Sequence, residues 1–73
     1  MPTRDRFLRT LGLRVRRLRE ERGLTQEKLG EKAQLDQTYI SGIECGARNP
    51  SALVLSKIAA ALKVSLAQLV EGV

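Results

Sequence analysis

The segment from Leu24 to Gly46 constrains the fold more than any other part of the chain, because it holds two short helical patterns separated by one tight turn. The first pattern starts at Thr25 and the second follows Asp36, and both residue types are common helix N-caps. The second pattern opens with small polar and amide side chains, which can hydrogen-bond to base edges in a DNA major groove. The segment therefore predicts two helices held across a turn, at about residues 25–45, with the second suited to reading DNA.

The residues before this segment predict one long helix. Apolar side chains recur there at steps of three and four residues, which is typical of a single buried helical stripe. The helix should run from about Arg4 to Arg22 and end at Gly23, because a glycine readily takes the left-handed conformation that follows many helices. The residues expected in the core of the whole chain share this helical spacing and are Phe7, Leu8, Leu11, Val15, Leu18, Leu29, Ala33, Leu35, Ile40, Ile43, Leu53, Leu55, Ile58, Ala59 and Leu62.

Two further helices are expected after the central segment. Asn49 and Pro50 are typical of the N-cap and first residue of a fourth helix. Ser65 and Gln68 form an S-x-x-Q capping box, which predicts a fifth helix at about residues 65–72. No strand-like alternation of polar and apolar residues is evident. The predicted fold class is therefore all-α, a compact five-helix bundle that forms one domain over residues 1–73.

The positive charge of the chain is concentrated near its start. The net charge is +5, and residues 1–22 hold eight arginines against three acidic residues, so the remainder is balanced. Such a basic stretch suits a polyanion, either nucleic acid or an anionic membrane, although a solvated helix face is the alternative. Because the apolar stripe of the same helix is needed for the core, nucleic acid is the favoured partner over a membrane.

The residue types exclude several other functions. The chain has no histidine and a single cysteine, and it carries neither a cluster of metal-ligating residues nor a nucleophile–base pair. We therefore expect no enzyme, cofactor, metal site or small-molecule ligand. Cys45 has no partner for an internal disulfide, and neither a signal peptide nor a run of about 20 apolar residues is present. These features predict a soluble, cytoplasmic protein.

Four stretches of the sequence together resemble a known family. They read GLTQEKL at residues 23–29, LDQTYISGIE at 35–44, GARNPS at 46–51 and IAAALKVS at 58–65. This pattern, from about residue 8 to residue 69, resembles the Cro/repressor-type (XRE-like) helix-turn-helix domains, which have a phage-repressor-like DNA-binding fold. The stretch LDQTYISGIE is similar to that of restriction–modification controller proteins, which are small dimeric regulators.

The resemblance implies a set of DNA-contacting residues, since the third helix of such domains enters the major groove with its N-terminal residues toward the bases. The residues that would read bases are Gln37, Thr38 and Ser41. The residues that would contact the DNA backbone are Gln26, Tyr39 and Arg48. For Tyr39, packing between two helices is an equally good interpretation.

The resemblance also pairs Arg19 with Glu44 as a structural ion pair that braces the motif. Two residues depart from the family pattern. Gln34 occupies a turn position at which a left-handed glycine is common, and Gly30 stands inside a helix where alanine is usual. Each departure should cost roughly 0.5–1 kcal/mol of stability without disrupting the motif.

The last helix is unusually apolar for its length, which makes it the best candidate for a dimer surface. The residues predicted there are Leu66, Leu69 and Val70, although packing onto their own core is the alternative. A homodimer would read two half-sites about one DNA turn apart. The function expected is a sequence-specific transcriptional regulator of a pseudo-palindromic operator, and the controller-protein resemblance implies a restriction–modification operon. The alternative is an antitoxin or adaptor that uses the same fold to hold a partner protein.

Overall fold

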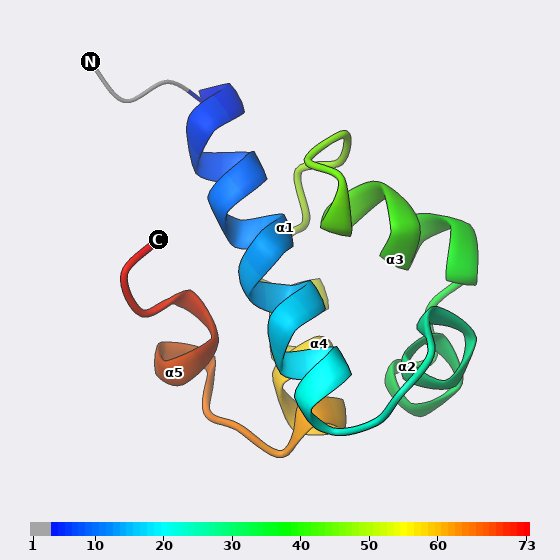
Figure 1. The fold of residues 1–73 in the computed structure, drawn as a ribbon. Coiled ribbons are helices and arrows are strands. Elements are labelled where there is room, and N and C mark those ends of the chain that lie inside the picture. Colours follow the sequence, from blue (N-terminus) through cyan, green and yellow to red (C-terminus); the bar gives the residue numbers. More distant parts are fainter. Residues whose placement is uncertain (1–3) are drawn as a thin grey trace.

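Five helices make up residues 4–73, which are the part of the chain that this computed structural model describes (Figure 1). No strand occurs within those residues, which confirms the all-α prediction. The helices are α1 (Arg4–Glu21), α2 (Gln26–Ala33), α3 (Gln37–Glu44), α4 (Ala52–Leu62) and α5 (Leu66–Val70). Within the described range, none of them is long and apolar enough to cross a membrane.

Helix α1 packs against α3 and α5, while α2 and α4 pack against each other. It runs through the middle of the molecule, with α3 on one side and α5 on the other (Figure 1). It ends at Glu21, one residue before the predicted end, and Gly23 follows with a φ of 67°. The Gly23 N–H donates to the Glu20 carbonyl at 3.0 Å and the Leu24 N–H to the Arg19 carbonyl at 3.1 Å. The glycine therefore ends the helix as predicted, through a Schellman-type pair of hydrogen bonds.

Three of the predicted N-caps are confirmed. The side chain of Thr25 accepts a hydrogen bond from the Lys28 N–H at 3.0 Å, which begins α2. The Asp36 carboxylate accepts from the N–H of residue 38 at 2.7 Å, which begins α3. Ser65 and Gln68 form both hydrogen bonds of the capping box, at 2.8 and 3.0 Å. Local side-chain chemistry therefore decides where these helices start.

The predicted start of α4 is wrong by two residues. Its N-cap is Ser51 and not Asn49, because the Ser51 hydroxyl accepts a hydrogen bond from the Val54 N–H at 3.2 Å. Pro50 lies before the helix, buried in the connection from α3, and does not form its first turn. Both serine and asparagine are good caps, and only the contacts of the folded chain decide between them.

The buried core consists of aliphatic side chains from all five helices. Phe7 and Leu53 were expected in it, but they are 45% and 67% exposed. Phe7 belongs to the N-terminal part of α1 that projects beyond the other helices in Figure 1. Leu53 lies five residues before Ile58, which places the two side chains on different faces of α4. The buried core residues are Leu8, Leu11, Val15, Leu18, Leu29, Ala33, Ile40, Ile43, Ile58, Ala59, Leu62 and Leu69.

The closest approach of α1 to α3 occurs at Gly12. A Cβ atom added there would lie 2.5 Å from the Glu44 carbonyl oxygen, and the Ile43 carbonyl oxygen would also be too close. The partners are backbone atoms, so a side chain could be accommodated only if the two helices moved apart. Gly12 therefore fixes how closely α3 is held against α1.

Replacing Gly12 with alanine should lower the free energy of unfolding by about 1–3 kcal/mol, because the added methyl group overpacks the contact between α1 and α3. Urea denaturation followed by circular dichroism measures this change. Leu13→Ala is the control, since Leu13 is the next residue of α1 and is 63% exposed. Equal losses of stability in the two variants would contradict the role of Gly12 in the close packing of α1 against α3.

Candidate DNA-binding surface

Helices α2 and α3 and the turn between them form the central structural unit. The turn residue Gln34 has a φ of 59° and a ψ of 43°, which is the left-handed conformation expected at this position. The Gln34 N–H donates to the Glu31 carbonyl at 3.3 Å, and the Leu35 N–H donates to the Gly30 carbonyl at 2.8 Å. A non-glycine residue in this conformation costs roughly 1 kcal/mol, which the surrounding hydrogen bonds and core contacts offset.

Gly30 has a role that the sequence did not indicate. It is buried, and a Cβ atom at this position would lie 2.6 Å from the Leu35 carbonyl oxygen. We expected glycine here to be only a cost relative to alanine, and the structure corrects that expectation. The turn brings backbone so close to α2 that the glycine is required.

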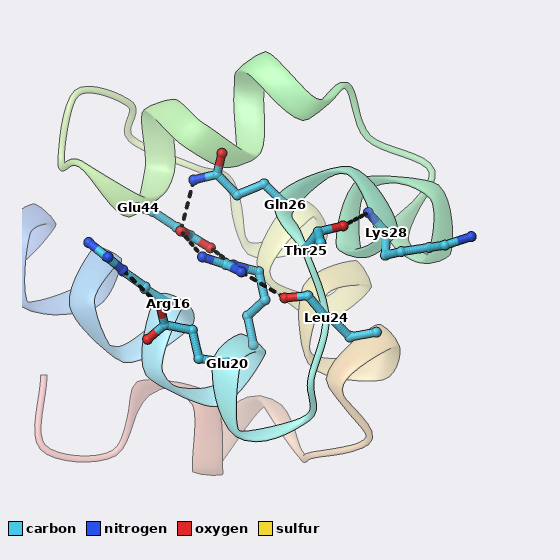
Figure 2. Close-up of polar contacts among 8 residues, drawn as sticks. Arg16, Glu20, Leu24, Thr25, Gln26, Lys28 and Glu44 are labelled. Carbon is cyan, nitrogen blue, oxygen red and sulfur yellow. Dashed lines mark hydrogen bonds and ion pairs between the residues drawn. The ribbon is translucent and has the colours of Figure 1, made fainter.

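The predicted pair of Arg19 and Glu44 is present and joins α1 to the end of α3. Arg19 Nε donates to Glu44 Oε2 at 2.6 Å and Arg19 Nη2 donates to Glu44 Oε1 at 3.1 Å. The Arg19 and Glu44 side chains are only 11% and 4% exposed. Arg19 Nη1 also donates to the Leu24 carbonyl at 2.7 Å, which fixes the connection from α1 to α2 (Figure 2).

The electrostatics of this pair follow from its geometry. Hydrogen bonding to Glu44 raises the pKa of the Arg19 guanidinium above its usual value, and attraction to Glu44 and Glu20 adds to this effect. Partial burial acts in the opposite direction but is the smaller influence. The guanidinium is therefore held as a cation, and it braces the motif instead of facing a ligand.

Gln26, predicted to contact the DNA backbone, is tied into the same cluster. Its Nε2 donates to Glu44 Oε1 at 3.0 Å, so that the Glu44 carboxylate accepts hydrogen bonds from both side chains (Figure 2). Gln26 is the first residue of α2 and is half-buried. The hydrogen bond to Glu44 positions the carboxamide at the N-terminus of α2, where the helix dipole favours an anion.

The three predicted base-reading residues lie within the first turn and a half of α3. Gln37 and Thr38 are exposed, and Ser41 is half-buried one turn further along the helix. Asp36 caps the helix through its side chain, so the first turn is held in place. Gln37 and Ser41 are four residues apart, so they lie on the same face of α3. The structure therefore places these side chains together at the start of one braced helix.

Tyr39 and Arg48, both predicted backbone contacts, meet beside α3. The Arg48 guanidinium lies over the Tyr39 ring, with its Cζ atom 6.0 Å from the ring centroid. Tyr39 is half-buried and packs against the core, so the packing interpretation holds for its ring.

The path of Arg48 depends on Gly42, a residue that sequence reasoning missed. A Cβ atom at Gly42 would lie 2.6 Å from Arg48 Cγ, so the arginine side chain crosses α3 where the glycine leaves room. The Ala47 and Arg48 N–H groups both donate to the Gly42 carbonyl, at 2.9 and 3.2 Å. The sequence did offer one signal for this contact, a glycine within a short, partly exposed helix. Such a glycine usually marks a place where another part of the chain lies close to the helix backbone.

The dimer residues predicted in α5 differ in their exposure. Leu69 is fully buried in the core of its own chain, which supports the alternative that it packs onto that core, and its place in a dimer surface stays a prediction. Leu66 is 38% exposed and Val70 is half-buried. Leu69 follows the capping box of Ser65 and Gln68 and closes the core under α5, while Leu66 is partly exposed.

Helices α2 and α3 form a helix-turn-helix unit. They are joined by a tight left-handed turn and braced by the buried ion pair of Arg19 and Glu44. Residues 15–69 match the helix-turn-helix family. The chain is 43% identical over 60 residues to y4dJ of Sinorhizobium fredii, an uncharacterized HTH-type transcriptional regulator, with 82% of this chain and 78% of y4dJ covered. The chain therefore belongs to the helix-turn-helix family, of the Cro/repressor (XRE-like) type.

Solved structures of restriction–modification controller proteins are also similar. C.AhdI from Aeromonas hydrophila matches with a TM-score of 0.84 and 40% identity, over 85% of this chain and 94% of C.AhdI. The C.Esp1396I tetramer, solved in complex with its natural 35-base-pair operator, matches with a TM-score of 0.77 and 42% identity, over 81% of this chain and 78% of that one. Similarity to these proteins confirms the family resemblance seen in the sequence.

Proposed function

We propose that this protein is a sequence-specific DNA-binding regulator of transcription and not an enzyme. The observation that carries the proposal is the start of α3, where Gln37 and Thr38 are exposed on a helix braced by Arg19 and Glu44. Amide and hydroxyl side chains of this kind discriminate between base pairs in the major groove. The similarity to HTH-type regulators and controller proteins supports the same function.

The proposed interface divides base reading from backbone binding. Gln37, Thr38 and Ser41 face base edges, while Gln26 and Arg48 bind phosphates on either side of them. The Tyr39 hydroxyl is a further backbone contact. Most arginines of α1 raise the local positive potential without contacting bases, and some already pair within α1, as Arg16 Nε does with Glu20 Oε2 at 3.3 Å.

The protein acts as a homodimer in this proposal, because one short recognition helix offers few base contacts. The dimer surface is the exposed side of α5, including Leu66 and Val70. The solved complex of C.Esp1396I contains a tetramer on its operator, which supports self-association on DNA within the family. We further infer one domain over residues 1–73, control of a restriction–modification operon, and a cytoplasmic, nucleoid-associated location.

Binding to selected DNA tests the proposed function. An operator is first selected from a random duplex library, and its affinity is then compared with that of a scrambled duplex by gel shift at two salt concentrations. We expect tighter binding to the selected duplex, and weaker binding to both duplexes at higher salt because arginine contacts release counterions. Equal affinity for selected and scrambled duplexes would overturn the claim of specificity. Neighbouring genes for a methyltransferase and an endonuclease would support the restriction–modification assignment.

Replacing Leu66 with glutamate should raise the dimer dissociation constant by at least about tenfold, because the variant buries a charge in the proposed interface. Sedimentation velocity over a range of concentrations measures the change. Leu53→Glu is the matched control, since Leu53 is a more exposed leucine, on α4. Dissociation by Leu53→Glu with no effect of Leu66→Glu would show that the dimer surface is on α4 instead.

A further inference from the structure

A pocket of about 220 Å³ lies where the C-terminal ends of α1, α2 and α4 meet. Its lining combines two kinds of side chain, three apolar and three cationic. The apolar residues are Leu24, Ala61 and Leu62, and the cationic residues are Arg22, Lys32 and Lys63. Among residues 4–73, no acidic residue lines the pocket, so its apolar floor has a positive rim.

The three cations reach this rim from separate elements, and only one of them is engaged. Arg22 Nε donates to the Leu62 carbonyl, which fixes the arginine beside the end of α4. Its Nη1 lies 3.9 Å from Glu21 Oε1, a loose contact between partly exposed groups. Within residues 4–73, neither Lys32 nor Lys63 has a side-chain hydrogen bond or ion pair. Two ammonium groups at the rim are therefore available to an anionic partner.

Lys63 has a backbone conformation that is uncommon for a residue other than glycine. It follows α4 with a φ of 59° and a ψ of 40°, the left-handed region that favours glycine at the ends of helices. A lysine near a helix C-terminus is stabilised by the helix dipole. A lysine one turn earlier, inside the helix, would have the same stabilisation without adopting the left-handed conformation.

The apolar floor is held in place by the same contacts that brace the helix-turn-helix unit. The Leu24 carbonyl accepts a hydrogen bond from Arg19, and its side chain points away from the polar cluster (Figure 2). The turn after α1 and the connection from α4 to α5 lie at the lower edge of Figure 1, whereas α3 is at the upper right. The pocket is therefore separate from the base-reading surface and preformed.

We propose that this pocket is a docking site for an acidic segment of a partner protein. One aliphatic or aromatic side chain of the segment sits on the floor formed by Leu24, Ala61 and Leu62, and flanking carboxylates face the three cations. Charge complementarity selects an anion, and the apolar floor favours a protein over duplex DNA, because the backbone of a duplex has no protruding aliphatic or aromatic side chain to fill the pocket. This role goes beyond DNA binding and does not depend on it.

The test uses the full chain and a synthetic peptide with blocked ends, in which a central leucine is flanked by three acidic residues on each side. Titration into the isotope-labelled protein, followed by amide chemical shifts, should give saturable changes at Leu24, Ala61 and Lys63. A matched peptide with a central serine should bind at least about fivefold more weakly, because the floor then remains uncovered. A peptide with glutamine in place of the acidic residues should bind more weakly still.

Protein variants separate binding from folding. Lys63→Gly removes one rim charge and also relieves the left-handed backbone, so we expect a protein at least as stable as wild type that binds the leucine peptide about three- to fivefold more weakly. Lys32→Gln should weaken binding by a similar factor. Lys57→Gln is the control, because it removes one exposed charge from α4 outside the pocket and should change affinity less than about twofold.

Several results would overturn the proposal. Equal affinity for the leucine and serine peptides, or the same shift changes with inorganic phosphate alone, would indicate a plain anion site. Displacement of the peptide by a DNA duplex would assign the pocket to nucleic acid. Chemical shift changes confined to the arginines of α1, or equal effects of Lys57→Gln and Lys63→Gly, would indicate attraction by net charge only. Pocket-centred shifts that need both the leucine and the acidic residues support the proposal.

Discussion

Replacing Glu44 with alanine should lower the free energy of unfolding by about 3–5 kcal/mol, because it leaves the Arg19 guanidinium partly buried without its partner. Glu44 accepts hydrogen bonds from both Arg19 and Gln26, and its side chain is 4% exposed. A chain of 73 residues has a total stability of roughly 4–11 kcal/mol, so the loss is a large fraction of the whole. Urea denaturation at low temperature measures it.

The matched control for this prediction is Glu20→Ala. Glu20 also pairs with an arginine, since Arg16 Nε lies 3.3 Å from Glu20 Oε2, but both side chains are more than half exposed. Solvent screens such a pair, and its loss should cost less than about 1 kcal/mol. Glu44→Gln is a second variant, which keeps one hydrogen-bond acceptor and should fall between the two. Similar losses for Glu44→Ala and Glu20→Ala would falsify the bracing role of the buried pair.

The positions of most helices could be predicted from sequence because their signals are local. Thr25, Asp36 and Ser65 each cap a helix through a hydrogen bond to the backbone two or three residues away. Gly23 likewise ends α1 within its own turn. Among the helix starts, that of α4 was misplaced, because two good caps, Asn49 and Ser51, stand close together and the choice between them depends on tertiary packing. The ends of α1 and α5 were each predicted one or two residues too late.

The features that could not be predicted mostly depend on distant parts of the chain. The periodicity of apolar residues placed Phe7 and Leu53 on the buried faces of their helices. It could not show that both side chains would be left largely exposed by the other helices. The crossing of Arg48 over Gly42 requires the loop after α3 to fold back onto that helix. The left-handed conformation of Lys63 is local, since the Lys63 N–H donates to the Ala60 carbonyl and the Val64 N–H to the Ala59 carbonyl, but a lysine at this position does not signal it as a glycine would.

The sequence predicted which residues belong to the candidate site better than it predicted their contacts. The resemblance gave the roles of Gln37, Thr38 and Arg48, and the structure places all three on or beside α3. Sequence reasoning treated Gln26 as a phosphate contact alone, whereas the structure shows its side chain donating a hydrogen bond to Glu44. One residue can brace the motif and bind DNA together, and spacing in the sequence cannot separate those two roles.

Replacing both Gln37 and Thr38 with alanine should reduce affinity for a selected operator by more than about tenfold for a pair of half-sites. Each good contact to a base edge is worth about 1–3 kcal/mol, and a symmetric dimer loses the contacts twice. Both side chains are exposed and neither provides a cap, so folding stability should change by less than about 1 kcal/mol. Fluorescence anisotropy with operator and scrambled duplexes measures the two affinities.

The ratio of those two affinities decides whether Gln37 and Thr38 read sequence. The double variant removes no charge, so its binding to scrambled DNA and the salt dependence of binding should stay close to those of wild type. Arg48→Ala is the contrasting variant, which should weaken binding to both duplexes and reduce the salt slope by about one. Ser56→Ala, an exposed polar position on α4, serves as the neutral control. If the double variant weakens both duplexes equally, the two residues act as backbone contacts, and sequence recognition must lie elsewhere on α3.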